Sequence, residues 1–404
     1  MATTPTQTPT PTAPTRAEPG ALSRCISPVE DSDFLDGYWE QKPLVVRREE
    51  PGRYDELLSL PNVERLICSN ALRYPAFRLV REGDRIDVRS YTSDVSWRPV
   101  PFTGTIDVDR VLTEVEAGAT IVLQALHHWW HALADFCRGL EAVLGHPAQA
   151  NAYFTPRSAQ GLAVHHDTHD VFVLQISGEK HWRVYEPVFE LPLKDQHYSR
   201  ALGHPGPPVE DVVLRSGDTM YLPRGWLHDA LTRNAESLHL TIGVNVYTRL
   251  DALKAALDEC AGDVEFRRSV PDDGELQADL LERLRERLDP DDVARRRRRK
   301  LGSTRRPIRD GQLSQLRALD SLTLETPLAR RPTTLAELDF PHLSFEGKTV
   351  TFPEHVREEV EFVVSADAPF TPEELPSELD DAGRLVLVRR LVREGLLAVQ
   401  DTAT

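Results

Sequence analysis

The chain of 404 residues is longer than one ordinary domain, and its hydrophobic content of 40% is enough for more than one buried core. Its 64 acidic and 48 basic residues give a net charge of −16, which argues against a protein whose whole surface binds nucleic acid. Cys25, Cys68, Cys137 and Cys260 are widely spaced without a CxxC pair, which excludes a zinc finger or a dense disulfide framework and predicts a cytoplasmic location.

The chain begins with the low-complexity sequence MATTPTQTPTPTAPTRAEPG, which is rich in Thr and Pro. This sequence has neither the basic nor the apolar segment of a secretory signal peptide, and no apolar run in the chain reaches membrane-spanning length. We therefore expect residues 1–24 to form a disordered tail, and we expect no membrane partner.

Residues 25–250 contain many short apolar runs separated by turn residues, the pattern of a mainly β domain. Strands at this spacing favour a sandwich or barrel over a parallel α/β sheet. One amphipathic helix, at 131–145, interrupts them and ends at a glycine. The predicted strands are QKPLVVRR (41–48), TIVLQAL (120–126), DVFVLQI (170–176), HWRVYEP (181–187), DVVLRSGDTMYLPRG (211–225) and LHLTIGVNVY (238–247).

Residues 251–335 have the periodicity of helices, with predicted segments at 250–262 and 274–292. A leucine stripe in the second segment is most often a packing face within the chain, and a subunit contact is the alternative. The basic run at 294–309 is interpreted as a solvated helix end, with a patch for an anionic partner as the alternative. The leucines of the stripe are Leu276, Leu280, Leu284 and Leu288.

Residues 336–404 predict three helices, at 353–367, 371–379 and from 380 onward, followed by a short strand. This order is typical of a winged helix. The segment is acidic overall, and reading DNA would need a basic face that extends beyond one helix. We therefore interpret it as a protein-contact module.

The sequence GLAVHHDTHDVFVLQISGEKHW (161–182) places histidines and aspartates directly before an apolar run. In a regular strand His165 and Asp167 would share one face, while His166 would point to the other. His169 would join the first pair only if the strand stayed regular. An imidazole and a carboxylate two residues apart can bind one divalent ion together.

A third ligand must come from another strand, and the candidates are His228 in LPRGWLHDA and His239 in SLHLTIG. Two histidines and one carboxylate leave open positions on the ion, as in the facial triad of non-haem Fe(II) oxygenases. A catalytic zinc site is the alternative. A single histidine at the end of a strand is by default an ordinary polar residue. The indication of a metal site therefore comes from the combination of the HxD pair before an apolar strand with a later histidine that follows a strand and a turn.

These motifs resemble the JmjC-type cupin hydroxylases of the ribosomal oxygenase group. The resemblance covers about residues 25 to 250 and implies a catalytic domain with the double-stranded β-helix fold of cupins. It also implies an α-helical dimerisation region at 251–335 and a C-terminal winged helix at 336–404. The matching residues are FLDGYWEQKPLVV (34–46), NAYFTPRSAQGLAVHHDTHDVFVLQISGEKHWRVYEP (151–187), GDTMYLPRGWLHDA (217–230) and SLHLTIGV (237–244).

The resemblance implies Fe(II) bound by His165, Asp167 and His228, with 2-oxoglutarate and O2 as co-substrates. It further implies that Lys180 pairs with the far carboxylate of 2-oxoglutarate, because an unpaired charge in that pocket would be costly. By alternation from Asp167, Lys180 would lie on the opposite face, so a turn at 177–178 is expected to reset the register.

Other positions match the pocket of the family in part. Asn151, His239 and Thr241 match residues that line it. His166 stands where relatives tolerate other residues, so we expect it behind the ligands or exposed. Gly243 replaces a hydroxyl residue of some relatives, which puts that one contact in doubt.

The resemblance implies a protein or peptide substrate, with ribosomal proteins as the expected class and arginine or histidine as the hydroxylated residue. It also implies a homodimer, and nucleic acid is not expected as a partner. Two alternatives stay open. One is N-methyl demethylation at the same iron centre, and the other is a non-enzymatic ligand-sensing cupin whose winged helix binds nucleic acid.

Overall fold

The computed structural model of the chain describes residues 20–400 except positions 49, 69–71, 98–99, 273, 275, 277, 310 and 377–378. Most of the tail expected at 1–24 lies outside the described residues. Its last residues do not fit that expectation, because helix α1 (Ala21–Ile26) begins within it. The side chains of Leu22 and Ile26 are fully buried, and this burial stabilises the segment against the rest of the domain.

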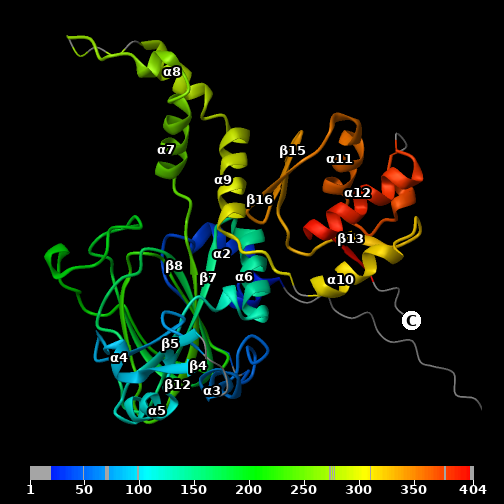
Figure 1. The fold of residues 1–404 in the computed structure, drawn as a ribbon. Helices are drawn as coiled ribbons and strands as arrows, with labels where there is room; N and C mark the ends of the chain where they lie inside the picture. The colour runs from blue at the N-terminus through cyan, green and yellow to red at the C-terminus, as the bar shows by residue number, and fades with distance from the viewer. Residues whose placement is uncertain are drawn as a thin grey trace, which may run out of the picture.

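A ten-stranded antiparallel sheet forms the larger part of the molecule (Figure 1). Its main path runs in the order β1-β10-β8-β12-β7-β6-β2-β3, and both β9 and β11 pair with β8. The mainly β prediction for this part of the chain is confirmed. The strands are β1 (Leu44–Val46), β2 (Phe77–Arg81), β3 (Asp84–Arg85), β6 (Thr120–Leu123), β7 (Ala148–Thr155), β8 (Asp170–Tyr185), β9 (Glu210–Arg215), β10 (Thr219–Leu222), β11 (Leu227–Leu231) and β12 (Ser237–Val244).

Strand β8 belongs to two groups of strands. Its first half pairs with β10 and β12, and its second half pairs with β9 and β11. Between the halves Gly178 has a φ of 67°, and a Cβ there would lie 1.9 Å from the carbonyl oxygen of Glu236, so this bend requires glycine. The segments predicted as separate strands at 170–176 and 181–187 are therefore one bent strand.

Both faces of β8 are buried, which explains its continuous apolar run. Phe172 and Leu174 belong to a core that includes residues of helices α1 and α6 (His131–Leu144). Val171 and Val173 belong to a second core, together with Trp182 from the other half of the strand. Full burial of each large apolar side chain contributes roughly 1.5–3 kcal/mol.

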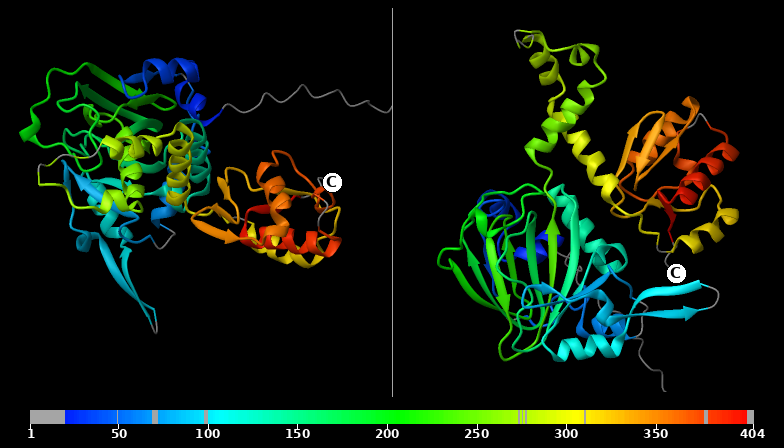
Figure 2. Two further views of the ribbon diagram at one scale, coloured as in Figure 1. Left: turned by 90° about the horizontal axis from the view of Figure 1, so that it is seen from above. Right: turned by 60° about the vertical axis from the view of Figure 1, so that its left-hand side comes forward.

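Helix α6 confirms the prediction at 131–145, and Gly145 ends it in the left-handed conformation with a φ of 70°. Figure 2 shows that a hairpin of β4 and β5 extends away from the sheet. These two strands and several short helices were not predicted from the apolar pattern. They are α2 (Asp31–Gly37), α3 (Leu60–Cys68), α4 (Val88–Tyr91), β4 (Thr92–Trp97), β5 (Val100–Ile106) and α5 (Val108–Glu116).

An arm of three helices projects from the sheet (Figures 1 and 2). It consists of α7 (Arg249–Cys260), α8 (Ala278–Glu286) and α9 (Pro290–Thr304). The helix predicted at 274–292 is shorter than expected, because Pro290 begins the next helix. The basic run forms most of α9 rather than only a helix end, and Arg297 donates to the carbonyl oxygen of Gly145 at 2.8 Å.

The C-terminal part has its own core, to which α11 and α12 contribute. Helices were expected at both positions. Of the segment predicted as a helix at 371–379, the described residues 371–376 and 379 contain a short 3-10 turn, Pro372–Glu374, and no α-helix. Pro376 has no N–H to continue a helix there. A winged helix stays a prediction. The elements are α10 (Gln312–Ala318), β13 (Leu328–Arg330), β14 (Ala336–Asp339), β15 (His342–Phe345), β16 (Lys348–Thr351), α11 (Arg357–Ser365), α12 (Asp381–Glu394) and β17 (Leu397–Val399).

Two buried ion pairs join α6 to the later parts of the chain. The Arg138 guanidinium donates to Glu346 Oε2 at 2.7 Å, and Arg305 Nε donates to Glu141 Oε2 at 2.6 Å. All four side chains are buried. Loss of one partner of such a pair typically costs about 3–5 kcal/mol, because the other charge stays buried without compensation. The first pair therefore ties the C-terminal part to α6, and the second ties the end of α9 to the same helix.

Within the described part of the chain, no helix has both the length and the apolar character needed to cross a membrane. All four cysteines are free thiols, and three of them are buried.

Candidate metal centre

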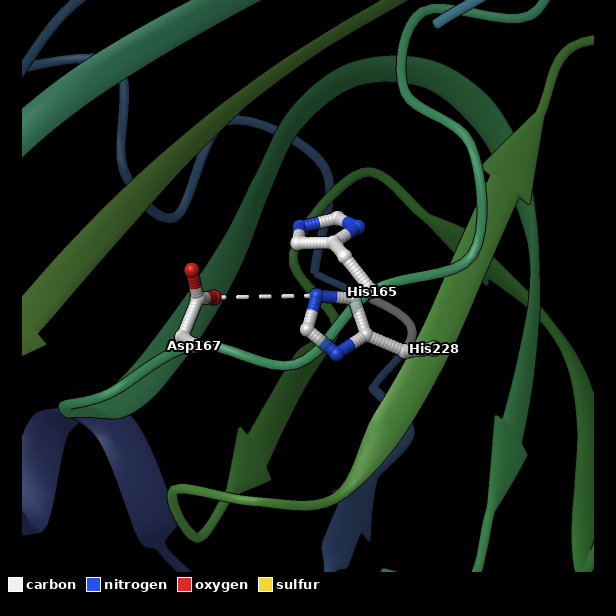
Figure 3. Close-up of side chains that lie close together, drawn as sticks. All are labelled: His165, Asp167 and His228. Atoms are coloured by element: carbon white, nitrogen blue, oxygen red, sulfur yellow. Dashed lines mark ion pairs between the residues drawn. The ribbon is translucent and has the colours of Figure 1, made fainter. Parts of the chain in front are cut away.

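Three potential metal ligands converge at one end of β8. The ligand atoms of His165, Asp167 and His228 all lie within 4.8 Å of one another (Figure 3). His228 Nε2 and Asp167 Oδ2 are 3.6 Å apart. The centroids of the two imidazole rings are 4.4 Å apart. Two nitrogens and one carboxylate oxygen at this separation can bind a single divalent ion.

The backbone brings these residues together. His165 and His228 face each other in an antiparallel bridge, with N···O distances of 3.1 and 2.8 Å in the two directions. The amide of Gly225 donates to the carbonyl oxygen of Asp167 at 3.1 Å. Each ligand is thus one hydrogen bond away from the segment that carries another ligand.

Hydrogen bonds at the other ring nitrogen set the orientation of both imidazoles. His165 Nδ1 lies 2.8 Å from the carbonyl oxygen of Ala163, and His228 Nδ1 lies 3.0 Å from that of Trp226. With the proton on Nδ1, the Nε2 atom of each ring carries the free lone pair. This arrangement is typical of metal-binding histidines.

The surroundings of these side chains favour the protonation states in which they can bind a metal ion. Burial lowers the pKa of His228 to about 4, with a further contribution from His165, so its imidazole is neutral at pH 7. Burial alone would raise the pKa of Asp167, but the surrounding imidazoles, foremost His169 and then His165, lower it below its usual value. A neutral imidazole and an ionised carboxylate are the forms that coordinate metals.

The regular strand assumed for the HxD pair is not formed. Strand β8 begins only at Asp170, and Asp167 lies in an irregular segment before it. His165 and Asp167 therefore share a side because of their hydrogen bonds and not because of strand alternation. His169 is outside the group of converging ligands among the described residues. The register change expected at 177–178 occurs as the bend at Gly178.

A buried cation lies beyond the bend of β8. Lys180 is only 4% exposed, and its Nζ donates to Thr155 Oγ1 at 3.0 Å. No carboxylate among the described residues forms an ion pair with it, and burial lowers its pKa to about 7. A buried ammonium without an anion is costly, so this site fits an anionic group that comes from a ligand.

The other predicted pocket residues lie on the paired strands β7 and β12, and β7 also carries Thr155. His239 faces Tyr153 across the strands and stacks on its ring at 5.0 Å, and Thr241 faces Asn151. The side-chain oxygen of Asn151 already accepts the amide of Ala125 at 2.9 Å. This hydrogen bond occupies the side-chain oxygen of Asn151 and holds the backbone at Ala125, which precedes α6.

Sequence reasoning missed three residues of this region. Tyr153 and Thr155 follow Asn151 at alternate positions of β7, so strand alternation already put them on the same face. Trp182 makes an edge contact with His239 at 5.4 Å and lies 6.0 Å from the His228 ring. It stands two residues after Lys180, so the same alternation indicated it.

Two further predictions concern residues near the ligands. His166 is buried, and its Nε2 lies 3.0 Å from the carbonyl oxygen of Gln196, which fits a place behind the ligands. At Gly243 a Cβ would lie 3.1 Å from both Gln149 Nε2 and His169 Nε2. The Gln149 and His169 side chains therefore occupy the space that a side chain at 243 would need.

Comparison with protein families identifies this part of the chain. Residues 126–251 match a family model described as a JmjC domain, and this range includes all three converging residues. This part of the chain is therefore similar to JmjC domains. The resemblance inferred from the motifs is confirmed.

Two proteins are similar in sequence to this chain over more than half of its length. The chain is 33% identical over 267 residues to ribosomal oxygenase 1 of Danio rerio, covering 61% of this chain and 45% of that protein. It is 32% identical over 222 residues to the bifunctional lysine-specific demethylase and histidyl-hydroxylase NO66 of Drosophila persimilis, covering 55% of this chain and 31% of that protein. The chain thus spans less than half the length of either relative.

Solved structures share the fold. The crystal structure of the Escherichia coli ribosomal oxygenase YcfD matches with a TM-score of 0.55 over 92% of this chain and 98% of that chain, at 17% sequence identity. Another structure of the same protein, in complex with cobalt and 2-oxoglutarate, matches with a TM-score of 0.54 at 18% identity, over 91% of this chain and 97% of that chain. The cupin-type β architecture around the JmjC domain is therefore established.

Proposed function

We propose that the protein is an Fe(II)- and 2-oxoglutarate-dependent dioxygenase that hydroxylates a side chain of a protein. The observation that carries this proposal is the convergence of His165, Asp167 and His228 within 4.8 Å. These residues would bind Fe(II) on one face and leave positions open for the co-substrates. With 2-oxoglutarate and O2, such a centre supplies the oxidising chemistry that converts a C–H bond into C–OH, and the protein need not supply a general base.

Lys180 supports 2-oxoglutarate as the co-substrate. Its buried ammonium and the Thr155 hydroxyl would bind the carboxylate that is farther from the metal. A zinc site with the same three donors would not by itself require this cation. His239 and Thr241 would line the same pocket, whereas Asn151 would act mainly through Ala125.

The substrate is proposed to be a ribosomal protein, with arginine or histidine as the hydroxylated residue. The names ribosomal oxygenase and histidyl-hydroxylase of the relatives support this class. The net charge of −16 fits a cationic partner only weakly, because it does not describe the binding groove.

N-methyl demethylation is the second candidate, and the name lysine-specific demethylase of one relative favours it. It would release formaldehyde after hydroxylation of the methyl group. A non-enzymatic sensor with a nucleic-acid-binding winged helix would instead show salt-dependent DNA binding and no succinate formation.

We further propose a homodimer formed through residues 251–335. In the helical arm several apolar side chains are exposed, among them Leu276 at 65% and Leu281 at 69%. Apolar surface of this kind is typical of protein interfaces. The C-terminal part has a separate core that already includes Leu319, Leu322 and Leu328, so it supports a division earlier than residue 336. The proposed role of this part is protein contact. A cytoplasmic location stays a prediction.

The experiment that tests the activity uses the whole chain with Fe(II), 2-oxoglutarate and air, and bacterial ribosomal proteins as substrates. We expect succinate together with a mass increase of one oxygen atom on a single peptide. Formaldehyde release without a stable mass increase would favour demethylation. The absence of succinate under all these conditions would contradict an oxygenase.

A further inference from the structure

A buried side-chain network connects the two chain segments that carry Asp167 and His228. Asp170 is the first residue of β8 and follows Asp167 by three positions. Arg224 lies in the turn between β10 and β11 and precedes His228 by four positions. The side chain of Asp170 is fully buried, and that of Arg224 is 7% exposed.

The Asp170 carboxylate joins these segments through three hydrogen bonds. Its Oδ1 accepts the backbone amide of Arg224 at 3.2 Å and the hydroxyl of Tyr221 at 3.0 Å. Its Oδ2 accepts Arg224 Nη1 at 3.1 Å. Charge-assisted bonds from a planar guanidinium fix direction as well as distance. The turn before His228 is therefore anchored to the start of β8.

The N-terminal segment completes the network through Glu40. Its carboxylate pairs with Arg224 Nη1, and its backbone amide donates to the Tyr221 hydroxyl at 2.9 Å. Glu40 has a φ of 57°, a backbone conformation that costs a residue other than glycine roughly 1–2 kcal/mol. The preceding Trp39 stacks on Tyr221 with ring centroids 5.8 Å apart. Strained backbone of this kind persists where surrounding contacts determine it.

These contacts give the YWEQKP motif at 38–43 a place in the molecule. The motif is far from the ligands in sequence, yet its glutamate contacts the arginine of the Pro-Arg-Gly turn. At the end of the same turn Gly225 donates to the carbonyl oxygen of Asp167 at 3.1 Å. A shift of Arg224 would therefore move the turn before His228 and would also disturb the hydrogen bond from Gly225 to the carbonyl oxygen of Asp167.

We propose that Glu40, Tyr221, Asp170 and Arg224 form a positioning network that sets the relative placement of Asp167 and His228 for metal binding. This inference rests on the proposed function, since it assumes that these ligands bind a metal. The four residues do not touch the ion. They act through the segments that carry the ligands, as supporting residues of metal sites do.

Binding of Co(II) alone to the full chain tests the network, followed by visible absorption of the bound ion. The variants are Glu40→Gln, Tyr221→Phe and Asp170→Asn, and the control is Glu354→Gln, which removes an exposed pair with Arg357. We expect each network variant to weaken Co(II) binding by about 10- to 100-fold and to change the spectrum of the bound ion. The control should bind as the unaltered protein does.

A purely structural role would give a different result. In that case the unfolding temperature of the metal-free variants would change, the Kd for Co(II) would stay within twofold of the unaltered protein, and the spectrum of the bound ion would not change. This outcome would overturn the inference. Tyr221→Phe removes one hydroxyl and keeps the ring, so it provides the test if the charge variants do not fold. His165→Ala separates the two claims. Suppose that the unaltered protein binds Co(II), that His165→Ala does not bind it, and that the network variants still bind it with unchanged affinity. In that case the proposed positioning network is wrong and the proposed metal site stands. If the unaltered protein binds no Co(II), the proposed function falls as well.

Discussion

Replacement of Lys180 by methionine should have opposite effects on ligand binding and on stability. In the ligand-free protein burial lowers the pKa of Lys180 from 10.5 to about 7. At pH 7 the cost of keeping this residue buried is about 4 kcal/mol, because each pKa unit corresponds to roughly 1.36 kcal/mol. Lys180→Met removes that cost, so the ligand-free protein should unfold at a temperature several degrees higher.

The same variant should bind 2-oxoglutarate poorly. The loss of one partner of a buried charge pair typically costs about 2–5 kcal/mol, which is a rise in Kd of roughly 30-fold to several thousand-fold. The assay is calorimetric titration of 2-oxoglutarate into protein saturated with Mn(II), with the exposed Lys194→Met as control. An unchanged Kd for 2-oxoglutarate, or a parallel loss of metal affinity, would refute the role assigned to Lys180.

The pH dependence follows from the lowered pKa of Lys180. Between about pH 7 and 10.5 the unfolded chain binds one more proton at this residue than the folded chain, so the stability of the ligand-free protein from this source rises with pH. Binding of a carboxylate requires the charged ammonium. The affinity for 2-oxoglutarate should therefore be nearly constant below pH 7 and fall up to tenfold per pH unit above it, a trend that Lys180→Met should lack.

His228→Ala should abolish both metal binding and succinate formation, measured by Co(II) absorption and by mass spectrometry, and retained turnover would remove this residue from the ligand set. Gly243→Ser should destabilise the protein by about 1–3 kcal/mol in urea unfolding without improving 2-oxoglutarate binding, because its Cβ would lie 3.1 Å from two neighbouring side chains. Leu257 of α7 and Leu281 of α8 are both exposed apolar residues of the arm. Leu257→Glu combined with Leu281→Glu should convert a dimer into monomers in sedimentation experiments, and a monomeric unaltered protein would show that the dimer prediction is wrong. Glu346→Gln should expose the C-terminal part to earlier proteolysis, since its buried arginine partner loses its counter-charge.

The three converging residues could be predicted from the sequence because each stands in a short, recognisable motif. His165 and Asp167 precede an apolar strand, and His228 follows a Pro-Arg-Gly turn at the end of another strand. The reasoning for the first pair was nevertheless wrong in detail, since strand alternation does not extend to them. What places them together is a set of backbone hydrogen bonds between segments about 60 residues apart in the chain, which no local pattern encodes.

The bend of β8 and the network around Asp170 could not be predicted for the same reason. Gly178 indicated a turn in the sequence. That β8 instead continues through this glycine depends on its pairing with four other strands, which the local sequence does not show. From the sequence, Asp170 was one more polar residue before an apolar run. Its partners Tyr221 and Arg224 come from a distant segment, and Glu40 joins the network only through contacts with those two residues. In the C-terminal part, Pro376 was a local signal against a helix that the acidic pattern around it obscured.

The most direct test of the account is a crystal structure of the protein grown without oxygen in the presence of Mn(II) and 2-oxoglutarate. We expect one ion, coordinated by Nε2 of His165, Nε2 of His228 and a carboxylate oxygen of Asp167, at distances near ~2.0–2.3 Å. The far carboxylate of 2-oxoglutarate should lie against Lys180. An ion bound elsewhere, or an imidazole at 228 turned away from it, would contradict the central claim.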